Sequence, residues 1–260
     1  MNILEQLADY ARIRVEKSKQ HCEPEKLHRM AATLPRGEFP FETALRKPGI
    51  SFICEIKRAS PSRGLISESF PFLQIAQEYE TGGADAISVL TEPKWFLGKD
   101  NYLQEIAAAV SIPCLRKDFT VDGYMIDEAK ILGASAVLLI CSILTEAQLC
   151  EYLKQCEELG LSALTETHDE REVEMALNAG AKIIGINNRN LKDFSVNTEN
   201  SRRLREKVPP EVLFVSESGI RDAANVQMLK EIGVDAVLIG EALMRAENRR
   251  EKLRELRGVR

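Results

Sequence analysis

The chain has 260 residues, of which 44% are hydrophobic and 29% are charged, and its formal net charge at pH 7 is −5. This length is typical of one large α/β barrel or of two domains of ordinary size. The negative charge argues against binding to nucleic acid or to a membrane surface. The longest apolar run, "ASAVLLICSIL", is too short to span a bilayer.

The cysteines and histidines predict neither a disulfide framework nor a metal site. The six cysteines include no CxxC pair, and the three histidines include no HxxxH or HxH pair. Scattered cysteines in apolar contexts are typical of reduced thiols, and the N-terminal stretch lacks the apolar core of a secretory signal. We therefore expect a cytoplasmic protein that holds no metal.

A helix is predicted at the N-terminus. Ile3, Leu7, Ala11 and Val15 recur at helical spacing, which indicates one apolar face. Residues 1–48 lie outside the repeat that follows, so we expect them to form a helical extension that packs on residues 49–260. The spacing does not indicate which end of that larger unit the helix covers.

Residues 49–260 contain a repeated pattern of helix, glycine and apolar run. Gly83, Gly133, Gly180 and Gly233 each follow a helical pattern, so each is expected to end a helix before a buried parallel strand. Four further strands are predicted between these runs. The predicted strands begin near residues 52, 86, 113, 136, 161, 182, 212 and 236.

Eight strand–helix units predict a (β/α)8 TIM barrel. The main alternative is a doubly wound sheet, which is expected to carry a glycine-rich fingerprint after its first strand. The sequence there is "KRASPSRG", which does not match that fingerprint. No low-complexity linker divides the chain, so we predict one structural domain with an N-terminal extension.

The predicted strand ends carry polar residues. Active sites of this fold lie at the carboxyl ends of the strands, and Glu55 and Lys57 lie on the same face of the first strand. Any one such residue could be a solvated strand end or part of a structural ion pair, but together they predict an active site. The polar strand ends are Glu55, Lys57, Lys117, Glu166, Asn187, Arg189, Glu217, Ser218 and Gly240.

The loops after the last two strands predict a phosphate site. "SESGIRD" and "IGEALMR" contain Gly219 and Gly240, where the backbone can approach a phosphate and donate N–H groups. Ser218 can add a hydroxyl and Arg189 a charge. The same glycines also suit tight turns, and the motif by itself fits many sugar-phosphate enzymes.

Six motifs taken together resemble the indole-3-glycerol-phosphate synthase family. They are "EIKRASPSRG", "LRKDF", "LTETHDE", "IGINNRNL", "VSESGI" and "LIGEALMR", in this order and spacing. The resemblance runs from about Ile3 to Arg245. It implies a cofactor-free lyase (decarboxylase) of tryptophan biosynthesis. That enzyme converts 1-(2-carboxyphenylamino)-1-deoxyribulose 5-phosphate into indole-3-glycerol phosphate, CO₂ and water.

The resemblance also implies roles for individual residues. The catalytic positions fall on Glu55, Lys57, Lys117, Glu166, Asn187 and Ser218. Phosphate or substrate contacts fall near Ser60, Arg189, Gly219 and Gly240. Glu241 stands where some family members carry a small hydroxyl residue, so we expect only its backbone to contact phosphate.

The chemistry of ring closure needs acids and bases. We expect Lys117 to protonate the developing alkoxide, with a pKa lowered by burial or by neighbouring cations. Lys57 and Glu166 are expected to act as acid and base in the final dehydration, in an order that the sequence leaves open. Glu55 is expected to orient Lys57 and to balance its charge.

The aromatic half of that substrate needs an apolar slot. Trp95, Phe96 and Phe119 are expected to form its walls, with Leu90 and Leu139 beneath them. Ordinary packing between loops and helices is the alternative for each of these side chains.

Two other functions fit the predicted rim. One is a Schiff-base aldolase that uses Lys117 as a covalent nucleophile. The other is a sugar-phosphate sensor without turnover, which the joint presence of two lysines and two acids disfavours. In every case we expect a phosphorylated small-molecule ligand and a monomer or weak homo-oligomer.

Overall fold

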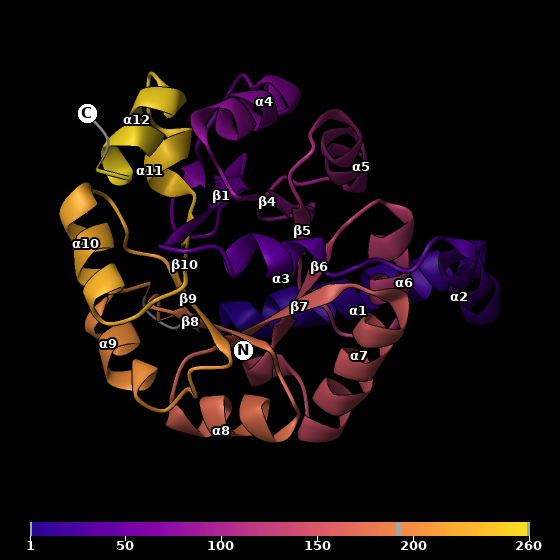
Figure 1. Cartoon of the computed structure of the whole chain (residues 1–260). Coiled ribbons are helices and arrows are strands. Elements are labelled where there is room, and N and C mark those ends of the chain that lie inside the picture. The colour runs from indigo at the N-terminus through magenta and orange to yellow at the C-terminus, as the bar shows by residue number, and fades with distance from the viewer. Residues whose placement is uncertain (1, 191–193, 259–260) are drawn as a thin grey trace.

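The computed structural model describes residues 2–190 and 194–258. Leu191, the last residue of the motif "IGINNRNL", therefore lies outside the described residues. So do the first residue of the predicted 1–48 segment and the last two residues of the predicted 49–260 segment. Within them the chain forms a closed barrel of eight parallel strands surrounded by helices (Figure 1). The barrel strands are β1 (Ser51–Ile56), β4 (Ala86–Leu90), β5 (Cys114–Lys117), β6 (Ala136–Ile140), β7 (Ser162–Thr167), β8 (Ile183–Asn187), β9 (Leu213–Glu217) and β10 (Ala236–Ile239).

The predicted (β/α)8 fold is confirmed, and each barrel strand begins within one residue of its predicted start. Neighbouring strands pair in parallel, and the barrel closes between β1 and β10, where Ser51 lies opposite Ala236. The glycines of the repeat end helices as expected: Gly83 and Gly233, for example, have φ angles of 93° and 77°. A left-handed backbone at these positions costs glycine little.

Helices follow every barrel strand and form the outer ring. They are α4 (Phe72–Gly82), α5 (Asp100–Ala109), α6 (Tyr124–Ile131), α7 (Glu146–Leu159), α8 (Glu170–Asn178), α9 (Glu199–Arg205), α10 (Ala223–Glu231), α11 (Glu241–Met244) and α12 (Arg249–Leu256). A short hairpin of β2 (Ala59–Ser60) and β3 (Gly64–Leu65) follows β1, and a 3-10 turn, η1 (Cys141–Ile143), follows β6.

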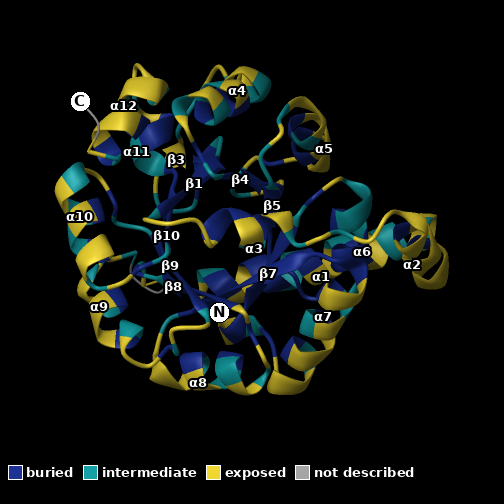
Figure 2. Cartoon of the chain, in the orientation of Figure 1, coloured by how far each residue is buried: buried dark blue, intermediate teal, exposed yellow. Residues whose placement is uncertain are grey.

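Two apolar layers hold the barrel together. Ile53, Leu115 and Leu138 point into the barrel, whereas Phe52 and Val137 point outward to the helices. This alternation follows from the two-residue period of a strand. The strands are buried, and the outward faces of the helices are exposed (Figure 2).

The N-terminal segment covers both ends of the barrel. It consists of α1 (Ile3–His21), α2 (Pro24–Thr33) and α3 (Pro40–Leu45). α1 lies at the carboxyl ends of the strands, where Leu7 lines a cavity. α3 lies at the opposite end, where the Glu42 N–H donates to Ser162 Oγ at the start of β7. The structure thus decides which end α1 covers.

Ion pairs fix α1 to the loop that follows β5. Arg14 forms a two-point contact with Asp118, with N···O distances of 2.6 and 3.1 Å. Farther along the helix, Lys19 Nζ lies 2.7 Å from Asp122 Oδ2. Asp118 follows Lys117 directly, so α1 is connected to a predicted catalytic strand end. In the described part of the chain, no helix combines the length and apolarity needed to cross a membrane.

Candidate active site

A cavity of about 440 Å³ opens at the carboxyl ends of the strands. Strand ends, the β2–β3 hairpin and the first turns of α1 line it. Almost all the predicted site residues meet there, although they are spread over nearly the whole sequence. The predicted residues that line the cavity are Glu55, Lys57, Ser60, Leu90, Phe96, Lys117, Phe119, Glu166, Asn187, Arg189, Ser218, Gly219, Gly240 and Glu241.

Leu139 was expected beneath the aromatic slot, and the structure corrects this. Its side chain belongs to the layer between strands and helices, while Leu138 and Ile140 face the cavity. Neighbouring residues of a strand point to opposite faces, so an error of one position moves a side chain to the wrong side of the sheet.

Trp95 is the second correction among the expected slot residues. The Glu92 carboxylate accepts the backbone N–H groups of Lys94, Trp95 and Phe96, which folds this loop tightly. As a result Phe96 faces the cavity, whereas the Trp95 ring packs edge-on against Tyr10 of α1, with centroids 5.6 Å apart. Trp95 therefore fixes α1 to the rim and is not part of the cavity lining that the described residues form.

Lys117 lies between two buried carboxylates. Its Nζ is 2.9 Å from Glu166 Oε2 and 3.2 Å from Glu217 Oε2. All three side chains are at least 88% buried, with exposures of 12%, 3% and 2%. Lys117 ends β5, Glu166 lies on β7 and Glu217 ends β9, so barrel closure brings them together.

The expected lowering of the Lys117 pKa is wrong for this structure. Burial alone lowers it, but the charges of Glu166, Glu217 and Glu55 outweigh burial and raise the pKa of Lys117 above its usual range. For Glu166, burial raises the pKa, yet Lys117 and His168 overcome burial and hold it below its ordinary value. Lys117 is therefore protonated and Glu166 ionised at neutral pH.

Glu217 behaves differently from Glu166. Burial, together with the nearby Glu166 charge, raises the pKa of Glu217 to about 7 although Lys117 opposes the change. Its Oε1 atom has no hydrogen-bond partner among the described residues. This oxygen lies over Gly185, where a Cβ atom would overlap it. A buried acid that is half protonated near pH 7 is suited to proton transfer.

The sequence analysis placed Glu217 at a strand end without giving it a role. The signal for Glu217 in the sequence was its place directly before Ser218, at the end of a predicted strand. Only the distance to Lys117 shows that Glu217 belongs to the same cluster.

Glu55 and Lys57 form the ion pair expected for one strand face. Lys57 Nζ lies 2.5 Å from Glu55 Oε1, and both side chains are largely buried. Gly240 makes room for this pair, because a Cβ atom there would lie 2.5 Å from Glu55 Oε1. The absence of a side chain at Gly240 therefore leaves space for the Glu55 carboxylate.

Asn187 connects the carboxylate cluster to the turn after β9. Its Nδ2 donates to Glu166 Oε1 at 3.2 Å, and its Oδ1 accepts from Ser218 Oγ at 2.9 Å. Ser218 and Gly219 have φ angles of 69° and 85°. A left-handed serine costs of order 1 kcal/mol, and such strain is common where backbone groups are aimed at a ligand.

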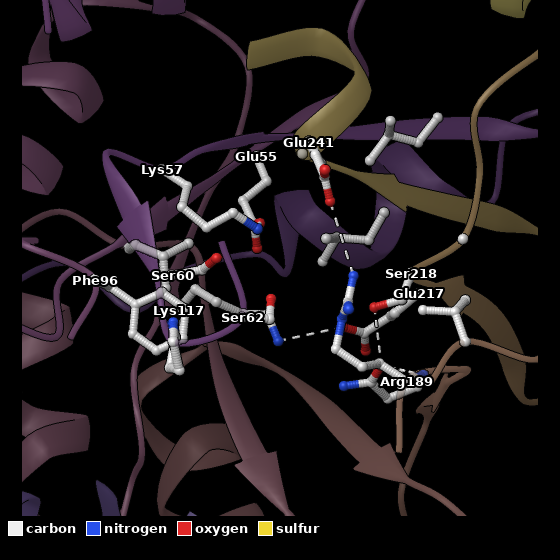
Figure 3. Close-up of a pocket in the computed structure, with 18 of the residues that line it drawn as sticks. Glu55, Lys57, Ser60, Ser62, Phe96, Lys117, Arg189, Glu217, Ser218 and Glu241 are labelled. Carbon is white, nitrogen blue, oxygen red and sulfur yellow. Dashed lines mark hydrogen bonds and ion pairs between the residues drawn. The ribbon is translucent and has the colours of Figure 1, made fainter. Parts of the chain in front are cut away.

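Three arginines lie close to the Glu241 carboxylate, and Figure 3 shows one of them, Arg189, reaching toward it. Arg63 Nε is 3.0 Å from Glu241 Oε1, and Arg189 Nη2 is 3.9 Å from Glu241 Oε2. Arg245 Nε is 3.6 Å from the same carboxylate. Arg189 and Arg245 line the cavity, and with the Ser218–Gly219 turn they form the part best suited to an anion.

This geometry defines a class of protein. A (β/α)8 barrel whose cavity combines buried lysines and carboxylates with an arginine-rich end is a barrel enzyme with an anion-binding subsite. Among the described residues, no group of three or more His, Cys, Asp or Glu side chains is arranged to hold a metal ion.

Comparison with known proteins identifies the family. The family model described as indole-3-glycerol phosphate synthase matches residues 4–256. The indole-3-glycerol phosphate synthase of Ruminiclostridium cellulolyticum is 52% identical, over 98% of this chain and 99% of its own length. That of Lachnoclostridium phytofermentans is 50% identical over 99% of both chains. The chain belongs to the indole-3-glycerol phosphate synthase family, and it is a carboxy-lyase of tryptophan biosynthesis.

Solved structures with low sequence identity share the fold alone. A 3-hexulose-6-phosphate synthase matches with a TM-score of 0.67 and 15% identity, over 80% of this chain and 99% of its own. A thiamine phosphate pyrophosphorylase from Pyrococcus furiosus matches with a TM-score of 0.60 and 20% identity, over 84% of this chain and 96% of its own.

Proposed function

We propose that the chain converts 1-(2-carboxyphenylamino)-1-deoxyribulose 5-phosphate into indole-3-glycerol phosphate, CO₂ and water, using only its own side chains. The observation that carries this proposal is Lys117, held in its protonated form between Glu166 and Glu217 inside the cavity. An acid at that place can protonate an oxygen that becomes negative while a carbon–carbon bond forms.

The two halves of the cavity orient the substrate. The phosphate binds to Arg189 and to the backbone N–H groups of the Ser218–Gly219 turn, where charge-assisted hydrogen bonds are strong. The aromatic ring lies against Phe96 and Phe119, whose centroids are 6.1 Å apart. Binding at both ends brings the ring carbon close to the ketone, which lowers the entropic part of the barrier.

In the first step the ring carbon that bears the carboxylate attacks the ketone carbon. The C=O electron pair moves to oxygen, and Lys117 donates a proton to the resulting alkoxide. An alkoxide is far more basic than an amine, so the raised pKa of Lys117 does not prevent the transfer. Glu217, whose pKa is raised to about 7 by burial, can return a proton to Lys117.

Decarboxylation and dehydration complete the reaction. The carboxylate leaves as CO₂, and its bonding electron pair restores the aromatic ring. Lys57, oriented by Glu55, attracts the carboxylate first and then protonates the departing hydroxyl. Glu166 is ionised, so it takes the role of base and accepts the proton that the intermediate releases. This proposal makes Lys57 the acid and Glu166 the base of the dehydration.

Incubation with the carboxyphenylamino-deoxyribulose phosphate tests this function. We expect indole fluorescence to rise with the wild-type chain and with Lys154→Ala, which changes a lysine that is 78% exposed. Lys117→Ala should show little turnover. A wild-type chain that produces no indole fluorescence, while folded, contradicts the proposal.

We further propose that the chain works in the cytoplasm as a monomer or weak homo-oligomer that binds neither nucleic acid nor membranes. The net charge of −5 supports this, because polyanionic surfaces repel an acidic protein. A mass near 29.2 kDa in solution would fit the monomer, and a stable dimer mass would contradict it.

A further inference from the structure

A histidine lies directly behind the proposed base. His168 follows β7, two residues after Glu166, and its side chain is 80% buried, with an exposure of 20%. Its Nε2 atom lies 3.5 Å from Glu166 Oε1 and is buried without a hydrogen-bond partner in the described ranges. The steps proposed above give this ring no role.

A second carboxylate faces the other nitrogen of the ring. His168 Nδ1 is 3.1 Å from Glu172 Oε2, and the same oxygen accepts the His168 backbone N–H at 2.8 Å. Ser142 Oγ–H donates to Glu172 Oε1 at 2.6 Å, and Asn200 Nδ2 donates to the His168 carbonyl. Contacts from η1, α8 and α9 therefore fix the ring and the carboxylate behind it.

Two carboxylates on opposite sides favour the imidazolium form. A neutral imidazole has one N–H and one lone pair, so one carboxylate would face a lone pair. The protonated ring presents an N–H to Glu172 and another to Glu166. Charges of opposite sign then follow one another from contact to contact: Glu172, His168, Glu166 and Lys117.

We propose that His168 is a positioning residue that keeps Glu166 ionised and oriented as the base of the dehydration step. This inference rests on the proposed role of Glu166. Lys117 is shared between Glu166 and Glu217, so a second cation beside Glu166 adds to the stabilisation of its ionised form. His168 is that cation.

The pKa values of both groups agree with this geometry. Burial lowers the pKa of His168, but Glu172, Glu166 and Glu217 together raise it above its ordinary value. The pKa of Glu166 is lowered mainly by Lys117, then by His168, against the effect of burial. These are the charged groups that face the pair: Glu172 from α8, Lys117 from β5 and Glu217 from β9. The polar neighbours from η1, β8 and α9 are the neutral Ser142, Asn187 and Asn200. The Cys141 thiol of η1 is also neutral, because burial raises its pKa to about 12.

The pH profile of His168→Gln tests the proposal. Glutamine can still donate a hydrogen bond but carries no charge, so the pKa of Glu166 should rise. We expect the acid limb of kcat to move to higher pH by roughly one unit, with KM nearly unchanged. At pH values well above the acid limb the two profiles should converge, because Glu166 is then ionised in both chains.

Two further variants control the experiment. Glu172→Gln should shift the acid limb in the same direction but less, and it provides the test if His168→Gln does not fold. His28→Gln replaces another histidine that faces a carboxylate, Asp127 at 3.1 Å, but lies on α2 outside the cavity; it should leave the profile unchanged. A uniform loss of kcat at every pH, in a folded His168→Gln chain, overturns the proposal.

An NMR titration of the His168 ring separates this inference from the proposed function. We expect a pKa above the ordinary value near 6.5 that falls in Glu166→Gln. An ordinary pKa that Glu166→Gln does not change overturns the inference even if indole is formed. If the His168 pKa is raised and falls in Glu166→Gln, but the chain shows no turnover, the interaction between His168 and Glu166 is supported and only the proposed function is contradicted.

Discussion

At the residue scale, the proposed chemistry depends on how protons are distributed among three buried titratable groups, Lys117, Glu166 and Glu217. Lys117 and Glu166 form a charged pair at 2.9 Å, and Glu217 makes the second contact to Lys117 at 3.2 Å. The Lys117 charge lowers the pKa of Glu166 below its ordinary value but does not overcome the effect of burial on Glu217. Glu217 therefore stays partly protonated near pH 7. The acid, the base and the proton reservoir thus differ in pKa although their surroundings overlap.

Lys117→Ala should remove most of the rate. Positioned acid catalysis contributes about 10²–10⁴-fold to the rate, so kcat should decrease by a factor of that size. KM should change far less, because the phosphate and aromatic contacts remain. Lys117→Arg should not restore activity, since a guanidinium holds its proton too firmly. Steady-state kinetics measures both effects.

Borohydride distinguishes the acid from the aldolase nucleophile at the same residue. An acid never bonds to carbon, so reduction in the presence of substrate should leave the mass of the chain unchanged. A stable mass increase located at Lys117 would favour the Schiff-base mechanism instead.

Glu217→Gln should stabilise the fold at high pH while it slows the reaction. The folded pKa of about 7 exceeds the ordinary 4.5 because of burial, so between these values the folded state binds more protons than the unfolded state. Stability is therefore lost as pH rises from about 4.5 to 7. Relative to wild type, the variant should gain about 1–3 kcal/mol between pH 4.5 and pH 8. Urea unfolding at both pH values measures this, and an equal difference at both would refute the shifted pKa.

At the scale of elements, short segments with special backbone geometry build the site. The Ser218–Gly219 turn connects β9 to α10, and α1 covers the rim through the Arg14–Asp118 pair. We propose that residues 1–48 are an extension of the barrel within one structural domain. The buried residues of α1, together with Phe41 and Leu45 of α3, belong to the same apolar cluster as the barrel interior, which supports a single domain.

Gly219→Ala should weaken phosphate binding. A Cβ atom there would lie 2.6 Å from Val196 Cγ1, at a φ of 85°, so the strained turn or the Val196 side chain must move. Lost charge-assisted hydrogen bonds cost about 1.5–3 kcal/mol, which corresponds to a rise in KM of roughly tenfold or more, and inorganic phosphate should compete less well. Gly180→Ala is the matched control: its φ is 86° with open space around it, so it should change stability but not KM. An unchanged KM in folded Gly219→Ala would place the phosphate elsewhere.

Arg14→Met should loosen α1. The change removes the guanidinium that donates two hydrogen bonds to the buried Asp118, which costs about 2–4 kcal/mol of unfolding free energy. KM should rise because α1 lines the cavity. Arg12→Met breaks only an exposed pair with Asp9 and should change stability little. If both variants unfold at the same urea concentration as wild type, the Arg14–Asp118 pair does not hold α1 in place.

At the scale of the whole molecule, closure of the barrel brings together the three parts of the candidate active site: the charged cluster around Lys117, the apolar slot and the arginine-rich end. Rearomatisation supplies the driving force for loss of CO₂, and lysines and arginines supply the positive charge. Turnover should therefore survive exhaustive dialysis against EDTA. Loss of activity that one divalent metal restores would contradict this prediction.

The sequence determined the fold and most of the residues around the cavity. The starts of strands and the glycines that end helices, such as Gly83 and Gly233, depend on local periodicity and backbone preference. Both can be recognised from residues that are neighbours in the sequence. Strand ends such as Lys117 and Glu166 could also be predicted to meet, because a parallel barrel places all carboxyl ends on one rim.

The tertiary structure decided what depends on distance between segments far apart in the chain. The pKa of Lys117 rises because carboxylates from two other strands approach it, and no pattern within β5 indicates that. The direction of the Trp95 ring depends on α1, and the side on which Leu139 lies depends on a one-residue register. Glu217 gained its role only through its 3.2 Å contact with Lys117, and His168 through its 3.5 Å approach to Glu166. Charge interactions depend on separation and burial, and only the closed barrel fixes both.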